Sequence, residues 1–220
     1  MNKRRLLFIL SNIFIAITTV AAVIVVEIYG SRAGRIDNNG FPFWQNIATF
    51  TVLSNIYLAI IATISTIYII RRRSSSFPRW LTTLYLSAVC SAMITFLTVI
   101  FYLAPMRVAA GKNYFDVLLE PMFFLHFFNP VLSAVIYIFF MDGVKLPLKS
   151  RLLALIPFVI YAIIYLVFVV ILKISPDFYG LTFGGRYYLT PLVFIGFLAV
   201  DFGIATILNT LQCKYLAHLK

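Results

Sequence analysis

Two residues that together could act as a nucleophile and a general base, Thr51 and His126, lie in long apolar stretches of this sequence. A hydroxyl beside an imidazole can attack a carbonyl carbon, because histidine accepts the hydroxyl proton as the new bond forms. The unperturbed pKa of histidine, about 6.5, suits it to this exchange near neutral pH. His126 is the single histidine within an apolar stretch, since His218 lies in the C-terminal tail. The pair predicts acyl transfer within apolar surroundings, without a metal or a cofactor.

Other polar side chains share a helical face with each of these two residues. Thr51, Ser54 and Asn55 are spaced at i, i+3 and i+4, and His126 and Asn129 at i and i+3. We predict that Ser54, Asn55 and Asn129 bind or orient a substrate. The alternative is structural, since asparagines form hydrogen bonds between membrane helices and a threonine often bonds the carbonyl four residues before it. A structural hydrogen bond would also account for His126.

A carboxylate within the last apolar stretch, Asp201, suggests other chemistry. Asp201 lies 11 residues, or about 16 Å, into that stretch. Ionisable groups at such depth often belong to ion or proton pathways, although a neutral, hydrogen-bonded acid is the simpler alternative. Asp201, Asn129 and Glu120 are also three unranked candidates for the group that would orient His126.

The amino-acid composition indicates the structural class of the protein. Of 220 residues, 62% are hydrophobic and 11% are charged, compared with about 45–50% and about 25% in soluble domains. These values exclude a soluble globular domain and a disordered chain. The apolar stretches are continuous rather than alternating, which favours membrane-spanning helices over a β-barrel. We therefore predict an all-α, polytopic membrane protein.

Six apolar stretches reach the length of about 20 residues that crosses a bilayer. They comprise residues 6–29, 47–70, 80–103, 121–141, 152–172 and 190–212. The loops between them are too short for a separate domain, so we expect residues 1–220 to form one integral membrane domain. Within the loops, residues 108–119 form either a short interfacial helix or a solvated segment.

The distribution of basic residues predicts the orientation. Twelve of the 18 Lys and Arg residues lie on the side of the chain termini and six on the other. The positive-inside rule then places both termini in the cytoplasm and the loops 30–46, 104–120 and 173–189 outside. The formal charge of +11 is thus expected to face anionic lipid headgroups rather than nucleic acid. Thr51 and His126 would both lie about 6–8 Å below the outer boundary, level with a lipid ester.

Two short motifs carry a resemblance to a known family. Phe-Thr-x-Leu-Ser-Asn occupies residues 50–55, and His-x-x-x-Pro occupies residues 126–130. With six spans and short loops, they resemble the bacterial six-helix membrane family related to the animal androgen-induced (AIG and ADTRP) proteins, which hydrolyse fatty acid esters of hydroxy fatty acids. The resemblance implies a lipid-ester hydrolase of the bacterial plasma membrane, with Thr51 as nucleophile and His126 as general base. Thr49 offers a second hydroxyl at the start of this span, and only the match to the family motif selects Thr51.

The chain departs from this family at the start of the last span. Where relatives have a Tyr-Pro pair followed closely by an acidic residue, this sequence has Thr190-Pro191-Leu192. The role of that acid in the relatives therefore has no counterpart here.

Two other functions stand beside the hydrolase. One is a small-molecule or proton-coupled transporter built on Asp201, and the other is a non-catalytic membrane scaffold in which His126 and Asn129 only hold helices together.

Overall fold

The computed structural model describes residues 3–33, 48–72, 76–119 and 121–218, and only the backbone of residues 27–33. Every regular element in these ranges is a helix, as the all-α prediction requires. Most of the predicted outer loop 30–46, the first residue of the second predicted span, and Glu120 lie outside the described residues.

Within the described ranges, five helices are long and apolar enough to cross a membrane. Three are continuous: α1 (Lys3–Ala33), α3 (Phe50–Arg72) and α9 (Leu189–His218). The other two are assembled from consecutive segments, namely α4 (Arg79–Thr98), η1 (Val99–Leu103) and α5 (Ala104–Ala109), and then α7 (Leu148–Leu153), α8 (Ile156–Tyr165) and η5 (Leu166–Ile171). They coincide with five of the six predicted spans.

The remaining predicted span, residues 121–141, folds as a shorter apolar helix, Phe124–Phe140. It consists of η3 (Phe124–Phe128), α6 (Asn129–Val135) and η4 (Ile136–Phe140). In an α-helix, the ring of Pro130 would collide with the carbonyl of residue 126. The helix widens into a π-turn before this proline, where the Asn129 N–H donates to the Phe124 carbonyl oxygen five residues back. Among the described residues, five of the six predicted spans are thus long helices, and the predicted span at 121–141 is a shorter apolar helix.

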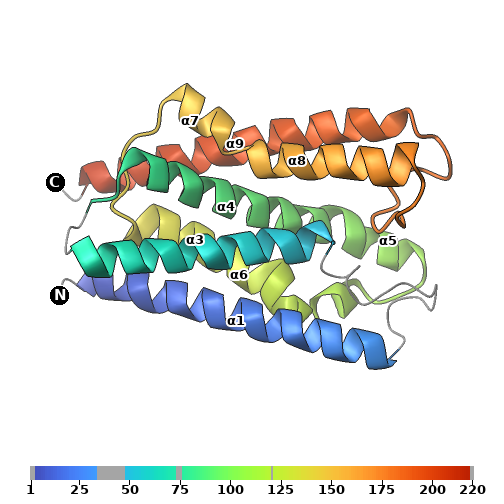
Figure 1. Cartoon of the computed structure of the whole chain (residues 1–220), viewed down its shortest axis with the longest axis horizontal. Helices are drawn as coiled ribbons and strands as arrows, with labels where there is room; N and C mark the ends of the chain where they lie inside the picture. The colour runs from blue at the N-terminus through green and yellow to red at the C-terminus, as the bar shows by residue number, and fades with distance from the viewer. Residues whose placement is uncertain (1–2, 34–47, 73–75, 120, 219–220) are drawn as a thin grey trace.

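The helices lie side by side with their long axes roughly aligned (Figure 1). The central helix is α4, which contacts α3, α6, α7, α8 and α9. Small buried residues of α4, such as Ser87, Ala88 and Ser91, let these neighbours approach closely. The start of α1 and the end of α9 lie at one end of the bundle, and α3 begins at the opposite end (Figure 1).

The segment 108–119, at the end where α3 begins, is not one interfacial helix. The helix α5 ends at Ala109, and a 3-10 helix, η2 (Tyr114–Leu118), follows after a bend. The Asn113 side chain accepts a hydrogen bond from the Phe115 N–H at 2.9 Å, while Asp116 accepts one from the Asn113 N–H at 3.2 Å. This capping box closes the first turn of η2, and η2 contacts η3 at the start of the Phe124–Phe140 helix.

Candidate active site

A cavity of about 700 Å³ lies at the end of the bundle opposite the chain termini. Its walls come from α1, the start of α3, α5, the η2 segment, η3 and the turn at residues 178–180. Thr51 and His126 both line this cavity. Its volume falls within the range of about 300–1,000 Å³ that is usual for ligand pockets. The two residues singled out for their chemistry therefore share one cavity.

Thr51 occupies the first turn of α3 and its side chain is nearly buried, at 7% exposure. The Tyr179 hydroxyl lies against this turn. It accepts a hydrogen bond from the Phe50 N–H at 2.8 Å and lies within hydrogen-bonding reach of the Thr51 hydroxyl. The Tyr102 hydroxyl donates to the Tyr179 carbonyl oxygen at 3.0 Å and holds its backbone. Burial raises the pKa of Tyr179, so the phenol keeps its proton beside Thr51.

The loop that carries Tyr179 is held by Asp177. Its carboxylate accepts a hydrogen bond from the Tyr165 hydroxyl and two more from the backbone N–H groups of Leu181 and Thr182, at 2.9 and 2.8 Å. Burial by itself would raise the pKa of Asp177, but these hydrogen bonds outweigh it and hold the pKa below its ordinary value. The ionised carboxylate therefore fixes the turn that presents Tyr179 to the cavity.

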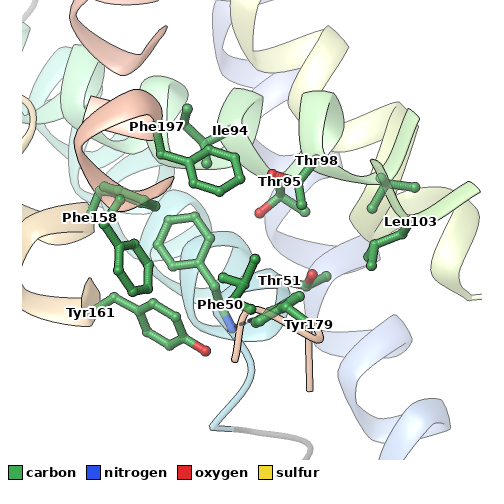
Figure 2. A pocket seen from close by; sticks show the side chains of 13 residues that line it. Phe50, Thr51, Ile94, Thr95, Thr98, Leu103, Phe158, Tyr161, Tyr179 and Phe197 are labelled. Atoms are coloured by element: carbon green, nitrogen blue, oxygen red, sulfur yellow. Dashed lines mark hydrogen bonds between the residues drawn. The ribbon is translucent and has the colours of Figure 1, made fainter. Parts of the chain in front are cut away.

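A second, smaller cavity of about 30 Å³ adjoins Thr51. Aromatic rings, including those of Phe50 and Phe158, lie on one side of it, and Thr95 and Thr98 lie on the other, as Figure 2 shows. Thr51 lines both cavities. A space of this size can hold a water molecule, which needs about 10–15 Å³. Thr51 thus lies between a ligand-sized cavity and a water-sized one.

His126 lies in η3, the π-turn that accommodates Pro130. Its Nδ1 atom is 2.6 Å from the Val117 carbonyl oxygen. A carbonyl oxygen can only accept a hydrogen bond, so in the neutral ring Nδ1 carries the proton and Nε2 carries the lone pair. A lone pair on one nitrogen, with the other nitrogen anchored, is what a general base requires. Among the described residues, no hydrogen bond joins His126 directly to Thr51.

Asn55 connects the helices that carry these two residues. Its fully buried amide Nδ2 donates to the Thr51 carbonyl oxygen at 2.8 Å and to the Leu125 carbonyl oxygen at 2.9 Å. Leu125 directly precedes His126 in η3. Asn55 does not line the cavity, so its observed contacts are those of the interhelical alternative.

Ser54 and Asn129 also bond to neighbouring helices. The Ser54 hydroxyl lies 2.9 Å from the Thr95 hydroxyl of α4. The Asn129 amide donates to the Thr19 hydroxyl at 3.0 Å and accepts a hydrogen bond from the Thr18 hydroxyl at 2.9 Å. Asn129 therefore joins α6 to α1 and has no described hydrogen bond to the imidazole. Neither Ser54 nor Asn129 lines the large cavity.

Asp201 lies apart from this site. It is completely buried in α9, lines neither of the two cavities, and has no hydrogen-bond partner for either carboxylate oxygen among the described residues. The Val117 carbonyl, rather than Asp201 or Asn129, contacts the imidazole; Glu120 lies outside the described residues. Side-chain patterns cannot reveal this partner, because every residue carries a backbone carbonyl.

Charged residues give the large cavity a polar side. Arg107, Lys112 and Asp116 line it together with apolar residues such as Val26 and Met122. The surroundings of Thr51 and His126 are therefore amphipathic. Arg107 lies in the last turn of α5 and Lys112 follows that helix, and nothing in the spacing of these basic residues indicates a site.

Comparison of the chain with protein-family models, with curated proteins and with solved structures found no match. The resemblance carried by residues 50–55 and 126–130 stays a prediction. Function is therefore inferred from the geometry of the cavity.

Proposed function

We propose that this protein is an intramembrane hydrolase of lipid esters, with Thr51 as the nucleophile and His126 as the general base. One observation carries the proposal: both side chains line a single amphipathic cavity of ligand size. The Val117 carbonyl supports the assignment of His126, because it fixes the tautomer in which Nε2 is free to accept a proton. The likeness of residues 50–55 and 126–130 to the androgen-induced family agrees with these roles.

The proposed reaction has two steps. The Thr51 oxygen attacks the ester carbonyl carbon while Nε2 of His126 takes its proton, and the leaving alcohol recovers that proton as its bond to carbon breaks. Water, deprotonated by the same imidazole, then attacks the acyl-threonine carbonyl carbon. The bond from that carbon to the Thr51 oxygen breaks, the imidazolium returns the proton to this oxygen, and the fatty acid is released. The Tyr179 hydroxyl beside Thr51 is suited to donate a hydrogen bond to the oxyanion.

We propose six membrane crossings, with both chain termini in the cytoplasm. The Phe124–Phe140 helix would span about 25 Å, slightly less than the bilayer core of about 30 Å. The common position of the start of α1 and the end of α9 supports an even number of crossings (Figure 1). The excess of basic residues at that end would contact anionic headgroups of a bacterial plasma membrane.

The test compares ester hydrolysis by purified wild-type protein, Thr51→Ala and His126→Ala in lipid nanodiscs, with a branched fatty acid ester as substrate. We expect each variant to lose hydrolysis by about 10³-fold or more, because nucleophile and base act as a unit. Thr66→Ala and His218→Ala are matched controls. Thr66 is a buried threonine of α3 about 22 Å from Thr51, and His218 is exposed.

Equal release of fatty acid by wild type and both variants would refute the hydrolase. A transporter or a scaffold predicts that result, and also predicts no covalent acyl group on Thr51. Mass spectrometry of protein quenched during turnover tests the acyl-threonine intermediate independently of the overall rate.

A further inference from the structure

A lipid-facing groove runs between α1 and α3, next to the active-site cavity on the side toward the end of α3. It encloses about 440 Å³. Ala59 and Thr19 line it and are nearly buried, at 8% and 1% exposure, whereas branched side chains such as Val20 and Ile60 also line it and are more than half exposed. The groove therefore combines small buried residues with branched side chains that extend toward the lipid.

The groove continues the line of the active-site cavity along both helices. On α3, Val52 lines the cavity and Ile56, one helical turn later, lines the groove. On α1, Val26 lines the cavity and Val23 lines the groove. The same helix pair thus borders both spaces. They share no lining residue, and the packed side chains of Val26 and Val52 lie between them, so an elongated molecule in the groove would reach Thr51 by passing over these two residues.

The polar groups of the groove are already paired. The Thr63 hydroxyl donates to the Ala59 carbonyl oxygen at 2.8 Å, and the Thr19 hydroxyl accepts from the Asn129 amide at 3.0 Å. The remaining lining is aliphatic. Both hydroxyl groups of the lining thus take part in hydrogen bonds and the rest is apolar, which favours a hydrocarbon occupant.

The length of the groove suits an acyl chain. From Val52 at the cavity to Ile64 at the far end is 12 residues of α3, or about 18 Å. One leaflet of the bilayer core is about 15 Å deep. A tail lying along α3 from Thr51 would therefore point toward the bilayer centre, in the direction that lipid tails already take.

We propose that this groove, defined by Ala16, Thr19, Val20, Ala59, Ile60 and Ile64, binds the long acyl chain of the ester whose carbonyl reaches Thr51. The inference rests on the proposed ester hydrolysis and adds its chain selectivity and the route of substrate from the lipid. A transmembrane helix of a second copy is the competing occupant, but a helix about 10 Å wide cannot continue into the cavity as a tail can.

The test places a large side chain in the groove and compares the hydrolysis of esters with long and short acyl chains. Wild type, Ala16→Phe and Ala59→Phe are assayed with p-nitrophenyl palmitate and p-nitrophenyl butyrate. Ala21→Phe, at an exposed position of α1 that does not line the groove, is the matched control. We expect the palmitate-to-butyrate rate ratio to fall about tenfold or more in the two groove variants and to stay unchanged in Ala21→Phe.

An unchanged ratio in a groove variant that keeps its thermal unfolding temperature would overturn the acyl-chain site. So would a wild-type dimer that both groove variants dissociate without changing the ratio, because a second copy would then fill the groove. Two groove positions are tested because the phenylalanine at Ala59 enters a nearly buried site.

If wild type cleaves neither ester, the proposed hydrolysis fails, and the groove is judged by photolabelling. A palmitate probe with a diazirine at its tail should then label the segment containing Ile60 and Ile64, and Ala59→Phe should abolish that labelling. Labelling spread evenly over the other lipid-facing helices, or unaffected by Ala59→Phe, would overturn the groove as well.

Discussion

The Asn55 side-chain amide donates a hydrogen bond to the Leu125 carbonyl oxygen at 2.9 Å, across the contact between α3 and η3. The same nitrogen donates to the Thr51 carbonyl oxygen at 2.8 Å. One buried amide therefore ties the turn that carries the proposed nucleophile to the residue before the proposed base. The Thr51 and His126 backbones are held together by Asn55 rather than by each other.

Asn55→Ala should lower both stability and hydrolysis. The substitution leaves the Thr51 and Leu125 carbonyl oxygens without this donor, so we expect the free energy of unfolding to fall by about 1–3 kcal/mol. A small displacement of η3 relative to α3 should reduce the hydrolysis rate by about 10–100-fold. Thermal unfolding in detergent and initial rates on the same samples measure the two effects.

Asn209→Ala is the control for this prediction. The Asn209 side-chain oxygen accepts a hydrogen bond from the Leu146 N–H at 3.2 Å, between α9 and the segment before α7. We expect a comparable loss of stability with an unchanged rate per folded molecule. Equal rate losses in both variants would mean that Asn55 has no special relation to the site.

Tyr179→Phe should reduce hydrolysis while the loop stays folded. The ring remains, but the hydroxyl beside Thr51 is lost, and removal of one such donor typically costs about 10²-fold in rate. Tyr187→Phe in the same loop is the matched control, since its ring packs under the Lys173 ammonium group, 4.7 Å away, and does not line the cavity. Full activity of Tyr179→Phe would show that the hydroxyl is only structural.

Asp177 should make the loop at residues 173–189 sensitive to acid. Because its pKa is lower in the folded protein than in an unfolded chain, the carboxylate stabilises the fold above the unfolded-state pKa. That contribution is lost as the pH falls below about 4 and through the folded-state pKa. Thermal unfolding measured from neutral to acidic pH should show this loss in wild type and a smaller loss in Asp177→Asn. Parallel profiles for the two proteins would contradict the assignment.

Cysteine labelling tests whether Phe124–Phe140 crosses the membrane. In a variant without Cys90 and Cys213, a membrane-impermeant maleimide added to intact cells should label Asp116→Cys and leave Lys145→Cys unlabelled until the cells are lysed. These exposed positions lie on either side of the helix. Labelling of both in intact cells would mean that the helix does not cross.

The five helices that are long and apolar enough to cross a membrane could be predicted from the sequence, because these properties depend on local composition. Continuous apolar residues such as those of 6–29 and 190–212 leave no other stable structure in a bilayer. The shortened helix at 124–140 was less predictable, since its π-turn arises from the conflict between Pro130 and the carbonyl of residue 126. The steric clash at Pro130 can be predicted from the sequence. Whether the helix avoids the clash through a π-turn or through a kink depends on the neighbouring helices.

The candidate site, like the fold, could be predicted from the sequence only in part. Residue types and helical spacing indicated His126 and a threonine at the start of the second span, because polar side chains are rare and costly in apolar spans. Only the likeness of residues 50–55 to the family motif favoured Thr51 over Thr49. Only the tertiary structure decided their partners: the Val117 carbonyl at His126, the Tyr179 hydroxyl at Thr51, and the pairing of Asn129 with α1. The order of helices around α4 follows from packing and hydrogen bonds between residues far apart in the chain, and such contacts leave no local pattern in one sequence.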